Sequence, residues 1–508
     1  MVSTIYSMGI SGINSFLVKI ESDVSSGMPM CDIVGLPDVA VKESKNRVRA
    51  AIKNCGYNFP VSRITINLAP ADIRKVGSLY DLPILLSILQ ASGQINVNFE
   101  ESIFLGELSL TGEVRRVNGV LSMVIESKNK GFKNIFVPFD NASEASIIKG
   151  INIYAIKNVS ELINHLLNKS NLSPHLHSNI NLNNNNEFLD FSFVKGQYVA
   201  KRAIEIAVAG NHNILMIGPP GSGKSMLAKH IKSILPDMTF DEMIETTSIY
   251  SISGQLNNEN PIITERPFRA PHHSISPSGL SGGGSIPRPG EISLAHNGIL
   301  FLDEFSEFSR ISLESLRQPL EDNNITISRV QSSVTFPCSI MLVAAMNPCP
   351  CGYYGHPTKR CTCSMRAIEK YMSKISGPTL DRIDIHIEVP PLNFDEINSP
   401  EKSESSCEIK KRILNAREIQ NKRYSKYGLY SNAKVTPELI SEVCKISENA
   451  KRLLKESFNA MSMSARVYNK ILKVARTIAD LESSETISEV HIHEAIQYRN
   501  LDRQYWKN

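Results

Sequence analysis

The stretch GPPGSGKS, Gly218 to Ser225, decides the fold of the central part of this chain. It matches the pattern G-x-x-x-x-G-K-[ST], follows the apolar run NILMIG and opens the helical pattern SMLAKHIKSIL. Glycines let the backbone N–H groups of such a turn surround phosphate oxygens, and the following helix N-terminus adds positive potential. We therefore predict a site for ATP and Mg²⁺. Its predicted residues are Gly218, Pro219, Pro220, Gly221, Ser222, Gly223, Lys224 on the β- and γ-phosphates, and Ser225 on Mg²⁺.

A second apolar run, GILFLDE, ends in Asp303 and Glu304. Four apolar residues followed by two acids are typical of a strand that brings carboxylates to the phosphates. We predict that Asp303 holds Mg²⁺ through water and that Glu304 polarises the attacking water. The alternative is that the two acids only cap the end of a strand.

The next apolar run, SIMLVAAMN, ends in Asn347. A polar side chain at this strand end can reach between the two preceding motifs, so we predict that Asn347 orients the water at the γ-phosphate. Alternatively, Asn347 caps a turn before Pro348. These strands are apolar on both faces and alternate with helices, which indicates a parallel sheet covered on both sides.

The composition of the chain changes three times, which predicts an α/β multidomain protein. Residues 1–167 predict a mixed α/β domain, and residues 190–391 predict the ATP-binding core with its parallel sheet. The polar, Asn-rich residues 168–189 predict a linker, or alternatively a long surface loop. Residues 392–508 predict a small helical domain. Apolar residues recur at helical spacing in four of its segments, near 402–424, 436–456, 464–482 and 488–499.

Charge and cysteine content restrict the class of protein. The formal net charge of +4 is too small to demand a nucleic-acid partner, so any DNA-binding surface must be a local patch. Nine cysteines in a long chain without a signal sequence argue for a reducing compartment, and we expect a cytoplasmic protein. No apolar run of about 18 residues occurs, so we expect no membrane span.

Beyond these motifs, the chain resembles the Mg-chelatase-like AAA+ proteins of the YifB/ComM family over nearly its whole length. The resemblance implies an S5/Lon-protease-like, ChlI-type N-terminal domain, an AAA+ P-loop core and a C-terminal helical lid. It implies an ATP-driven hexameric ring, and for ComM-type members a helicase that migrates DNA branches during natural transformation. The stretches that carry it are FRAPHHSISPSGLSGGGSIPRPGEISLAHNGILFLDE (268–304), LRQPLED, NPCPCGYYG, SGPTLDRIDIHIEVP and SARVYNKILKVARTIADLE.

Two other functions share the same ATPase core. One is a metal-chelatase-type motor subunit that drives Mg²⁺ insertion into a porphyrin, and the other is a non-motor regulatory ATPase. ATP turnover that rises with branched or single-stranded DNA would favour the helicase.

The resemblance assigns two arginines and one adenine-binding segment. Arg382, in LDRID, matches an arginine finger that acts on the ATP of the neighbouring subunit; alternatively, it pairs locally with Asp381 or Asp384. Arg466, in SAR, matches a sensor on the helical lid of the same subunit; alternatively, it is a surface arginine. The segment Lys195-Gly196-Gln197 resembles the one that brackets adenine.

Two insertions are candidates for DNA contact, namely residues 266–291 and the stretch ITISRVQSSVTF, 325–336. The second predicts a two-stranded hairpin with Arg329 near its tip, and one arginine per subunit of a ring could follow a phosphate backbone. Alternatively, both are subunit-contact loops. The adjacent His272 and His273 of the first insertion predict a structural role rather than a metal site.

The N-terminal domain resembles the proteolytic domain of Lon proteases but lacks the expected catalytic residues. The position of the nucleophilic serine falls on Leu79, and the position of the lysine falls on Leu121. We therefore expect no peptidase activity, and we expect a DNA-binding or assembly module instead.

The loop NPCPCGYYGHPTKRCTCS, residues 347–364, contains four cysteines as two Cys-x-Cys pairs. Four thiolates are the number that a structural zinc ion takes, although Cys-x-x-Cys is the more usual spacing. The alternatives are reduced thiols in a packed loop or a redox-sensitive pair. His356 is a spare candidate ligand. The predicted zinc ligands are Cys349, Cys351, Cys361 and Cys363.

Overall fold

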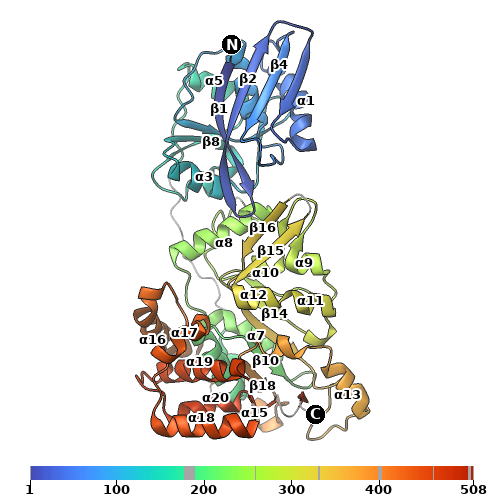
Figure 1. Cartoon of the computed structure of the whole chain (residues 1–508), viewed down its shortest axis with the longest axis vertical. Helices are drawn as coiled ribbons and strands as arrows, with labels where there is room; N and C mark the ends of the chain where they lie inside the picture. The colour runs from blue at the N-terminus through green and yellow to red at the C-terminus, as the bar shows by residue number, and fades with distance from the viewer. Residues whose placement is uncertain are drawn as a thin grey trace. The chain divides into compact units, whose positions relative to one another are not determined.

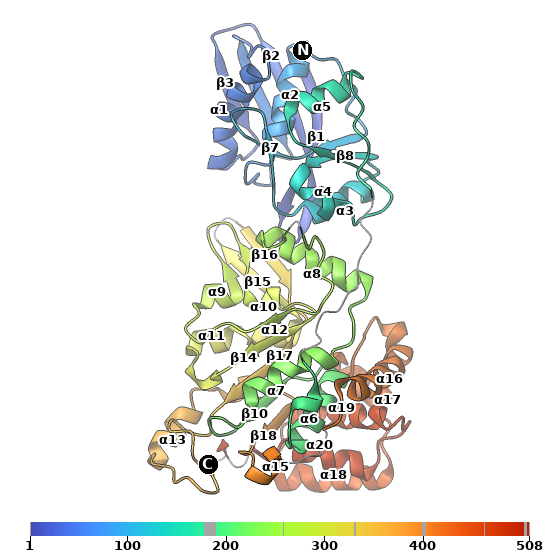
Figure 2. The same ribbon diagram turned by 180° about the vertical axis from the view of Figure 1, so that it is seen from behind.

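The computed structural model confirms a mixed α/β protein and divides the chain into two compact units (Figures 1 and 2). The first unit comprises Met1–Leu182, Phe240–Thr264 and Ser328–Phe336, and the second comprises the rest. Most of the predicted Asn-rich linker lies outside the described residues. The structure describes residues 2–176, 189–257, 259–329, 332–398, 403–461, 463–501 and 505–506, without the side chains of 329, 332, 397 and 398.

The first unit is built on a seven-stranded mixed sheet in the order β3-β4-β2-β1-β5-β8-β9. Polar and apolar residues alternate in RITINLA, and every second side chain of the strand that it forms, β4, is buried. The stretch DLPILLSILQA forms helix α2, whose side chains are buried except for Gln90. The elements are β1 (Val2–Ser11), β2 (Asn14–Ser25), β3 (Met30–Val34), α1 (Val39–Asn54), β4 (Arg63–Ala69), α2 (Asp81–Ala91), β5 (Ser102–Phe104), β6 (Glu107–Leu108), β7 (Val114–Arg115), α3 (Val120–Asn129), β8 (Asn134–Pro138), α4 (Ala142–Ala145), β9 (Asn152–Ile156), α5 (Val159–Leu166) and α8 (Phe240–Ser253).

Helix α8 belongs to the first unit although it comes from the middle of the chain. It packs against α3, and the hydroxyl of Ser251 donates a hydrogen bond to the buried carboxylate of Glu144. Burial raises the pKa of Glu144 above its usual range, while the hydroxyl of Ser251 opposes the shift. No sequence pattern predicted the packing of α8 on α3 or the hydrogen bond between Ser251 and Glu144, because both join segments far apart along the chain.

The second unit contains the predicted parallel sheet, in the order β11-β14-β17-β10-β18. All residues of β10, β14 and β17 are buried, as their apolar runs predicted. Strand β17 lies between β10 and β14, so the residues that follow these three strands meet at one edge of the sheet. The strands of this unit are β10 (Ile214–Ile217), β11 (Phe268–Arg269), β12 (Gly282–Gly283), β13 (Arg288–Pro289), β14 (Ile299–Leu302), β17 (Met341–Met346) and β18 (Ile385–Glu388). The hairpin strands β15 (Asn324–Arg329) and β16 (Ser332–Pro337) come between β14 and β17 in the chain, and their part in Ser328–Phe336 is assigned to the first unit.

Helix α6 (Tyr198–Gly210) contacts strand β18 and also the C-terminal helices α16 (Ser406–Tyr424) and α19 (Ala465–Leu481). Figures 1 and 2 show the C-terminal helices gathered beside the sheet of the second unit. No described helix combines the length and apolar character needed to cross a bilayer. The remaining helices before the C-terminal group are α6 (Tyr198–Gly210), α7 (Lys224–His230), α9 (Pro277–Ser281), α10 (Glu291–Leu294), α11 (Arg310–Ser315), α12 (Arg317–Asp322), α13 (Met365–Met372), α14 (Gly377–Leu380) and α15 (Phe394–Asn398).

The helical spacing predicted near 436–456 corresponds to two helices in the structure, with a break between them. Ile446 forms a parallel bridge with Ile487, and the N–H of Ser447 donates to the carbonyl of Ile487. This pairing holds the chain extended between the two helices. The C-terminal helices are α16 (Ser406–Tyr424), α17 (Pro437–Val443), α18 (Glu448–Met461), α19 (Ala465–Leu481) and α20 (Glu489–Gln497).

Candidate active site

The predicted phosphate-binding loop, Gly218 to Ser225, follows β10 and leads into α7; we call it the phosphate loop. Its backbone conformation requires glycine at two positions. Gly221 and Gly223 have φ of +79° and +92°, a left-handed conformation that glycine adopts without steric cost. A Cβ on Gly218 would lie 2.2 Å from the carbonyl oxygen of Val389. The loop therefore turns tightly against the segment after β18.

Lys224 is a buried cation, and the described residues that it contacts offer it neutral oxygens. Its side-chain Nζ donates to the carbonyls of Gly218 (2.7 Å) and Pro219 (2.9 Å) and lies 3.4 Å from Oδ1 of Asn347. Of the residues that the structure describes, none offers this ammonium a carboxylate at ion-pair distance. Burial lowers the pKa of Lys224 to about 8, and the charge of Asp303 opposes that shift. A buried cation without a paired anion fits a phosphate ligand.

Ser222 gives a second indication that the loop fits a polar ligand. Its Oγ is buried and has no hydrogen-bond partner among the described residues. Buried hydroxyls normally have a partner, and a phosphate oxygen would supply one.

The two predicted Mg²⁺ ligands are in direct contact. Oγ of Ser225 donates to Oδ2 of Asp303 at 2.5 Å, and the N–H of Glu304 donates to Oδ1 of the same carboxylate at 2.9 Å. Hydroxyl and carboxylate oxygens are hard ligands that suit Mg²⁺. These two residues could hold the ion beside the phosphates.

Glu304 has a backbone φ of +51°, which is uncommon for a residue other than glycine. Its side chain is about half exposed, and one carboxylate oxygen lies 2.9 Å from Nδ1 of His273. No pattern in the sequence predicted this pairing, because the two residues follow different strands. Strand β11 lies beside β14, so His273, just after β11, comes to the same sheet edge as Glu304.

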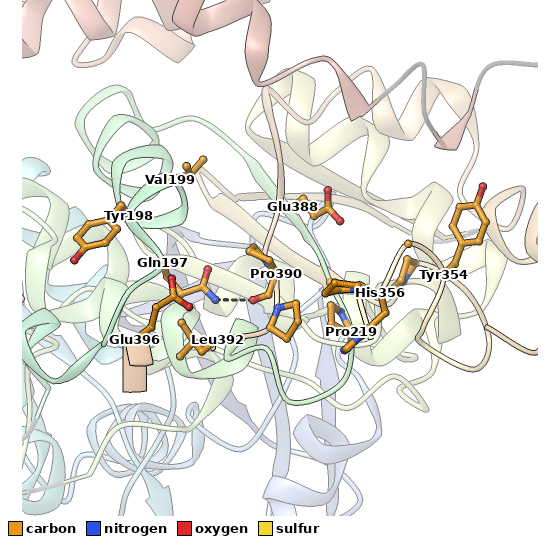
Figure 3. Close-up of a pocket in the computed structure, with 15 residues that line it drawn as sticks. Gln197, Tyr198, Val199, Pro219, Tyr354, His356, Glu388, Pro390, Leu392 and Glu396 are labelled. Carbon is orange, nitrogen blue, oxygen red and sulfur yellow. Dashed lines mark hydrogen bonds between the residues drawn. The ribbon is translucent and has the colours of Figure 1, made fainter. Parts of the chain in front are cut away.

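A cavity of about 490 Å³ adjoins the phosphate loop, a size typical of small-molecule sites. Gln197, with φ of +54°, donates from Nε2 to the carbonyl of Pro390 at 2.7 Å and lies 3.4 Å from the carbonyl of Ser222. Figure 3 shows Gln197 and Leu392 together at one part of this cavity, and His356 beside Pro219. The nucleoside part of an ATP molecule held at the phosphate loop could occupy this cavity.

The structure brings Arg382 and Arg466 together, but not at the phosphate loop. Nη2 of Arg382 lies 2.7 Å from Oε1 of Glu321, and Nη2 of Arg466 lies 3.7 Å from the same oxygen. Arg382 precedes β18, whereas the phosphate loop follows β10, its parallel neighbour. The two sites therefore lie at opposite edges of the sheet.

Two arginines of the first insertion have partners inside the chain. Arg269 forms a two-bond ion pair with Glu291, both distances being 2.6 Å. Arg266 donates to the carbonyls of Pro236 (2.6 Å) and Asn297 (2.7 Å). The hairpin residues pair as the strands β15 and β16, but the side chain of Arg329 lies outside the described residues.

The four cysteines of the loop after β17 lie together. All four Sγ atoms are within 4.8 Å of one another. The backbone N–H groups of Tyr353 and Thr362 lower the pKa of Cys351 to about 5. His356 does not belong to this group, and its Nδ1 accepts N–H bonds from Thr358 and Lys359.

Three family descriptions match successive parts of this chain. Residues 20–141 match "Subunit ChlI of Mg-chelatase", residues 190–397 match "Magnesium chelatase, subunit ChlI", and residues 403–499 match "Magnesium chelatase, subunit ChlI C-terminal". Together they cover most of both units.

Curated relatives match over almost the full length. The chain is 42% identical over 509 residues to "Competence protein ComM" of Haemophilus influenzae, covering 99% of this chain and 98% of that protein. It is 41% identical over 507 residues to "Uncharacterized protein YifB" of Escherichia coli, with the same coverage. A more distant similarity, 22% over 303 residues, covers 57% of this chain and 34% of "DNA replication licensing factor mcm2" of Schizosaccharomyces pombe. The AAA+ relationship supports an ATPase, and the chain belongs to the YifB/ComM family of Mg-chelatase-like proteins.

Proposed function

We propose that this protein is an ATP-hydrolysing AAA+ ring motor that acts on DNA. The main support for ATPase activity is that Lys224, Asp303 and Asn347 lie at the same edge of the parallel sheet. Each residue follows a different strand, and Lys224 is a buried cation with no carboxylate at ion-pair distance among the described residues. Such an edge is where ligands bind in open α/β sheets.

The side chains divide the work of hydrolysis among them. Lys224 would neutralise the β- and γ-phosphates, while Ser225 and Asp303 would hold Mg²⁺, which supplies further positive charge. The carboxylate of Glu304 would orient the attacking water and accept its proton, and the amide of Asn347 would orient the water from the other side. The exposure of Glu304 leaves room for a water molecule at its oxygens.

Arg382 and Arg466 would complete the active site of a neighbouring subunit. Both lie at the sheet edge opposite to the phosphate loop of their own chain, where Glu321 holds them close together. A guanidinium that cannot serve its own nucleotide can still reach a partner's γ-phosphate in a closed ring. We propose a hexamer in which Arg466, which the resemblance predicted to act within its own subunit, acts across the subunit boundary instead, because it shares the carboxylate of Glu321 with Arg382.

The support for DNA as the substrate comes from the names of the relatives. A full-length relative is named as a competence protein, and a more distant one as a DNA replication licensing factor. We propose a helicase that promotes branch migration when incoming DNA recombines during natural transformation, in the cytoplasm. The alternatives are a motor for Mg²⁺ insertion into a porphyrin and a regulatory ATPase.

The N-terminal unit would serve assembly or DNA binding rather than peptidase chemistry. Leu79 and Leu121, at the positions of the Lon-type serine and lysine, are buried leucines without a reactive atom. Ser78, the serine that directly precedes Leu79, donates a hydrogen bond from its hydroxyl to the carboxylate of Glu107. We propose that the S5/Lon-like fold is kept here as a scaffold.

A branch-migration assay tests the proposed function. Purified protein is mixed with labelled three-way and four-way DNA junctions, with and without ATP, and strand exchange is followed. We expect ATP-dependent exchange and an ATP turnover that rises with branched DNA, both absent in Glu304→Gln. Turnover that no DNA changes would contradict the DNA motor, and ATP-driven Mg²⁺ insertion into a porphyrin would favour the chelatase alternative.

A further inference from the structure

The loop after β17 holds four thiols at the spacing of one metal ion. The Sγ–Sγ distances are 3.3 Å for Cys349 and Cys351, 3.7 Å for Cys349 and Cys361, and 3.5 Å for Cys351 and Cys361. A tetrahedron with metal–sulfur bonds of ~2.3 Å has sulfur–sulfur edges of about 3.8 Å. A disulfide needs sulfur atoms only ~2.05 Å apart, so these thiols are not bonded to one another.

The fold around the thiols suits one soft cation. The N–H of Tyr354 donates to Sγ of Cys349 at 3.3 Å, a contact that stabilises a thiolate. Gly352 and Gly355 have φ of +83° and +76°, which turns the chain sharply between the two Cys-x-Cys pairs. A tetrahedral set of four thiolates selects zinc over hard cations such as Mg²⁺, and it leaves no open position for catalysis.

The same loop contacts the phosphate loop. A Cβ on Gly352 would lie 2.5 Å from Cδ of Pro220, so the first turn of the cysteine loop packs against GPPGSGKS without a gap. A Cβ on Gly355, by contrast, would meet nothing within 4 Å. Of these two glycines, only Gly352 therefore lies directly against Pro220.

The segment between the two cysteine pairs forms part of the cavity wall. Tyr354, Gly355 and His356 line the cavity next to the phosphate loop, opposite Gln197 (Figure 3). The Nδ1 of His356 accepts N–H bonds from Thr358 and Lys359, which fixes the turn. This wall has no helix or strand of its own, so its shape depends on what ties its two ends together.

We propose that the chain binds one structural Zn²⁺ through Cys349, Cys351, Cys361 and Cys363, and that the ion fixes the wall of the nucleotide pocket. Zinc occupancy would therefore set the affinity for ATP. The second half of this inference rests on the proposed ATP site, while the first half stands without it.

The metal site is tested by composition and spectroscopy of the full-length chain. We expect about one zinc per chain by elemental analysis, and a cobalt-substituted chain should show the absorption of a tetrahedral tetrathiolate. The double variant Cys361→Ser/Cys363→Ser should hold at least about tenfold less zinc. Cys407→Ser, at an exposed cysteine outside the group, is the matched control and should keep its zinc. A wild-type chain that takes up no zinc, or that holds iron instead, would overturn the site.

The link to the nucleotide pocket is tested with a matched pair of glycine variants. Both Gly352→Ala and Gly355→Ala place a side chain at a positive φ, but only the first collides with Pro220. We expect both to keep zinc, and Gly352→Ala to bind a fluorescent ATP analogue about tenfold more weakly than Gly355→Ala. Equal affinities of the two variants for the ATP analogue would show that the contact between Gly352 and Pro220 does not link the cysteine loop to nucleotide binding.

Chelation of the metal gives a test that needs no variant. Removing zinc from the wild-type chain should weaken binding of the ATP analogue, and added zinc should restore it. Unchanged nucleotide affinity in the zinc-free chain would overturn the coupling. A chain that holds zinc but binds no nucleotide would contradict the proposed function and the coupling while supporting the zinc ligands.

Discussion

At the scale of single residues, the burial of Lys224 is the feature with the clearest chemical consequence. A lysine that only carbonyl and amide oxygens contact carries its charge at a cost, which is why its pKa falls to about 8. A bound phosphate would favour the charged form and raise that pKa again. ATP binding therefore takes up a proton when the pH exceeds the pKa of the free site.

This linkage predicts a pH-dependent affinity for ATP. Affinity should be constant below pH 8 and should fall by up to about tenfold per pH unit above it, because the free site has then lost the proton. Titration with a fluorescent ATP analogue between pH 7 and about 9.5 measures the slope. Lys224→Arg is the control, since a guanidinium stays charged throughout this range. An equally steep slope in that variant would assign the effect to another group.

Glu304 is the residue on which hydrolysis should depend. Glu304→Gln keeps the shape of the side chain but removes the proton acceptor, so ATP binding should persist while turnover falls by about 10²–10⁴-fold. The matched control is Glu307→Gln, whose carboxylate pairs with Lys374 on the surface at 3.1 Å and should leave turnover unchanged. Normal turnover by the Glu304→Gln protein would show that another group activates the water.

At the scale of elements, one buried ion pair joins the helix α19 to the sheet. Nζ of Lys470 lies 2.7 Å from Oδ1 of Asp384, just before β18, and the N–H of Asn213, just before β10, donates to Oδ2 at 2.9 Å. Burial alone would raise the pKa of Asp384, but the charge of Lys470 and contact with His212 outweigh it and hold the pKa well below its usual range. The contact ties the C-terminal helices to the ATP-binding core.

We predict that Asp384→Asn destabilises the protein by about 3–5 kcal/mol, because Lys470 is then left buried without a counter-charge. Chemical unfolding monitored by circular dichroism measures the change. Glu485→Gln, which breaks the exposed pair with Lys445, should cost no more than about 1 kcal/mol.

The pH dependence of this loss has a fixed sign. A carboxylate with a lowered pKa stabilises the fold above the unfolded pKa of about 3.9, and that stability is lost as the pH falls. The stability difference between wild type and Asp384→Asn should therefore be constant near neutral pH and shrink below about pH 4. A difference that grows on acidification would contradict the ion-pair assignment.

At the scale of the whole molecule, the two arginines at Glu321 bear on assembly. Arg382 reaches this carboxylate from the segment before β18, and Arg466 reaches it from the start of α19. They come from segments far apart in the sequence and lie at the sheet edge away from the phosphate loop. In a ring, such an edge would face the nucleotide of the next subunit.

Mixing experiments test this arrangement. Arg382→Ala protein added to wild type should lower ATP turnover below the sum of the two components, since each variant subunit would disable a neighbour's site. Arg310→Ala is the control, because that exposed arginine pairs with Glu314 four residues away and with no other carboxylate in the described part of the chain. Turnover that follows the simple sum of the components would argue against action between subunits.

Sequence patterns predicted most of the second unit because its signals are local. Four-residue apolar runs became β10 and β14, and the acids and amide after the strands fell where a parallel sheet requires. The break between α17 and α18 was missed because it depends on pairing of Ile446 with Ile487, about forty residues away. The attachment of α8 to the first unit was missed for the same reason.

Short motifs read in order were enough to predict the family, the phosphate loop and the candidate site residues. Only the tertiary structure decided that His273 holds Glu304, that Arg382 and Arg466 meet at Glu321, and that the cysteine loop packs on Pro220. The physical reason is that each of these contacts joins residues from different strands or helices. Their distances are set by sheet order and packing, which no local pattern of residues contains.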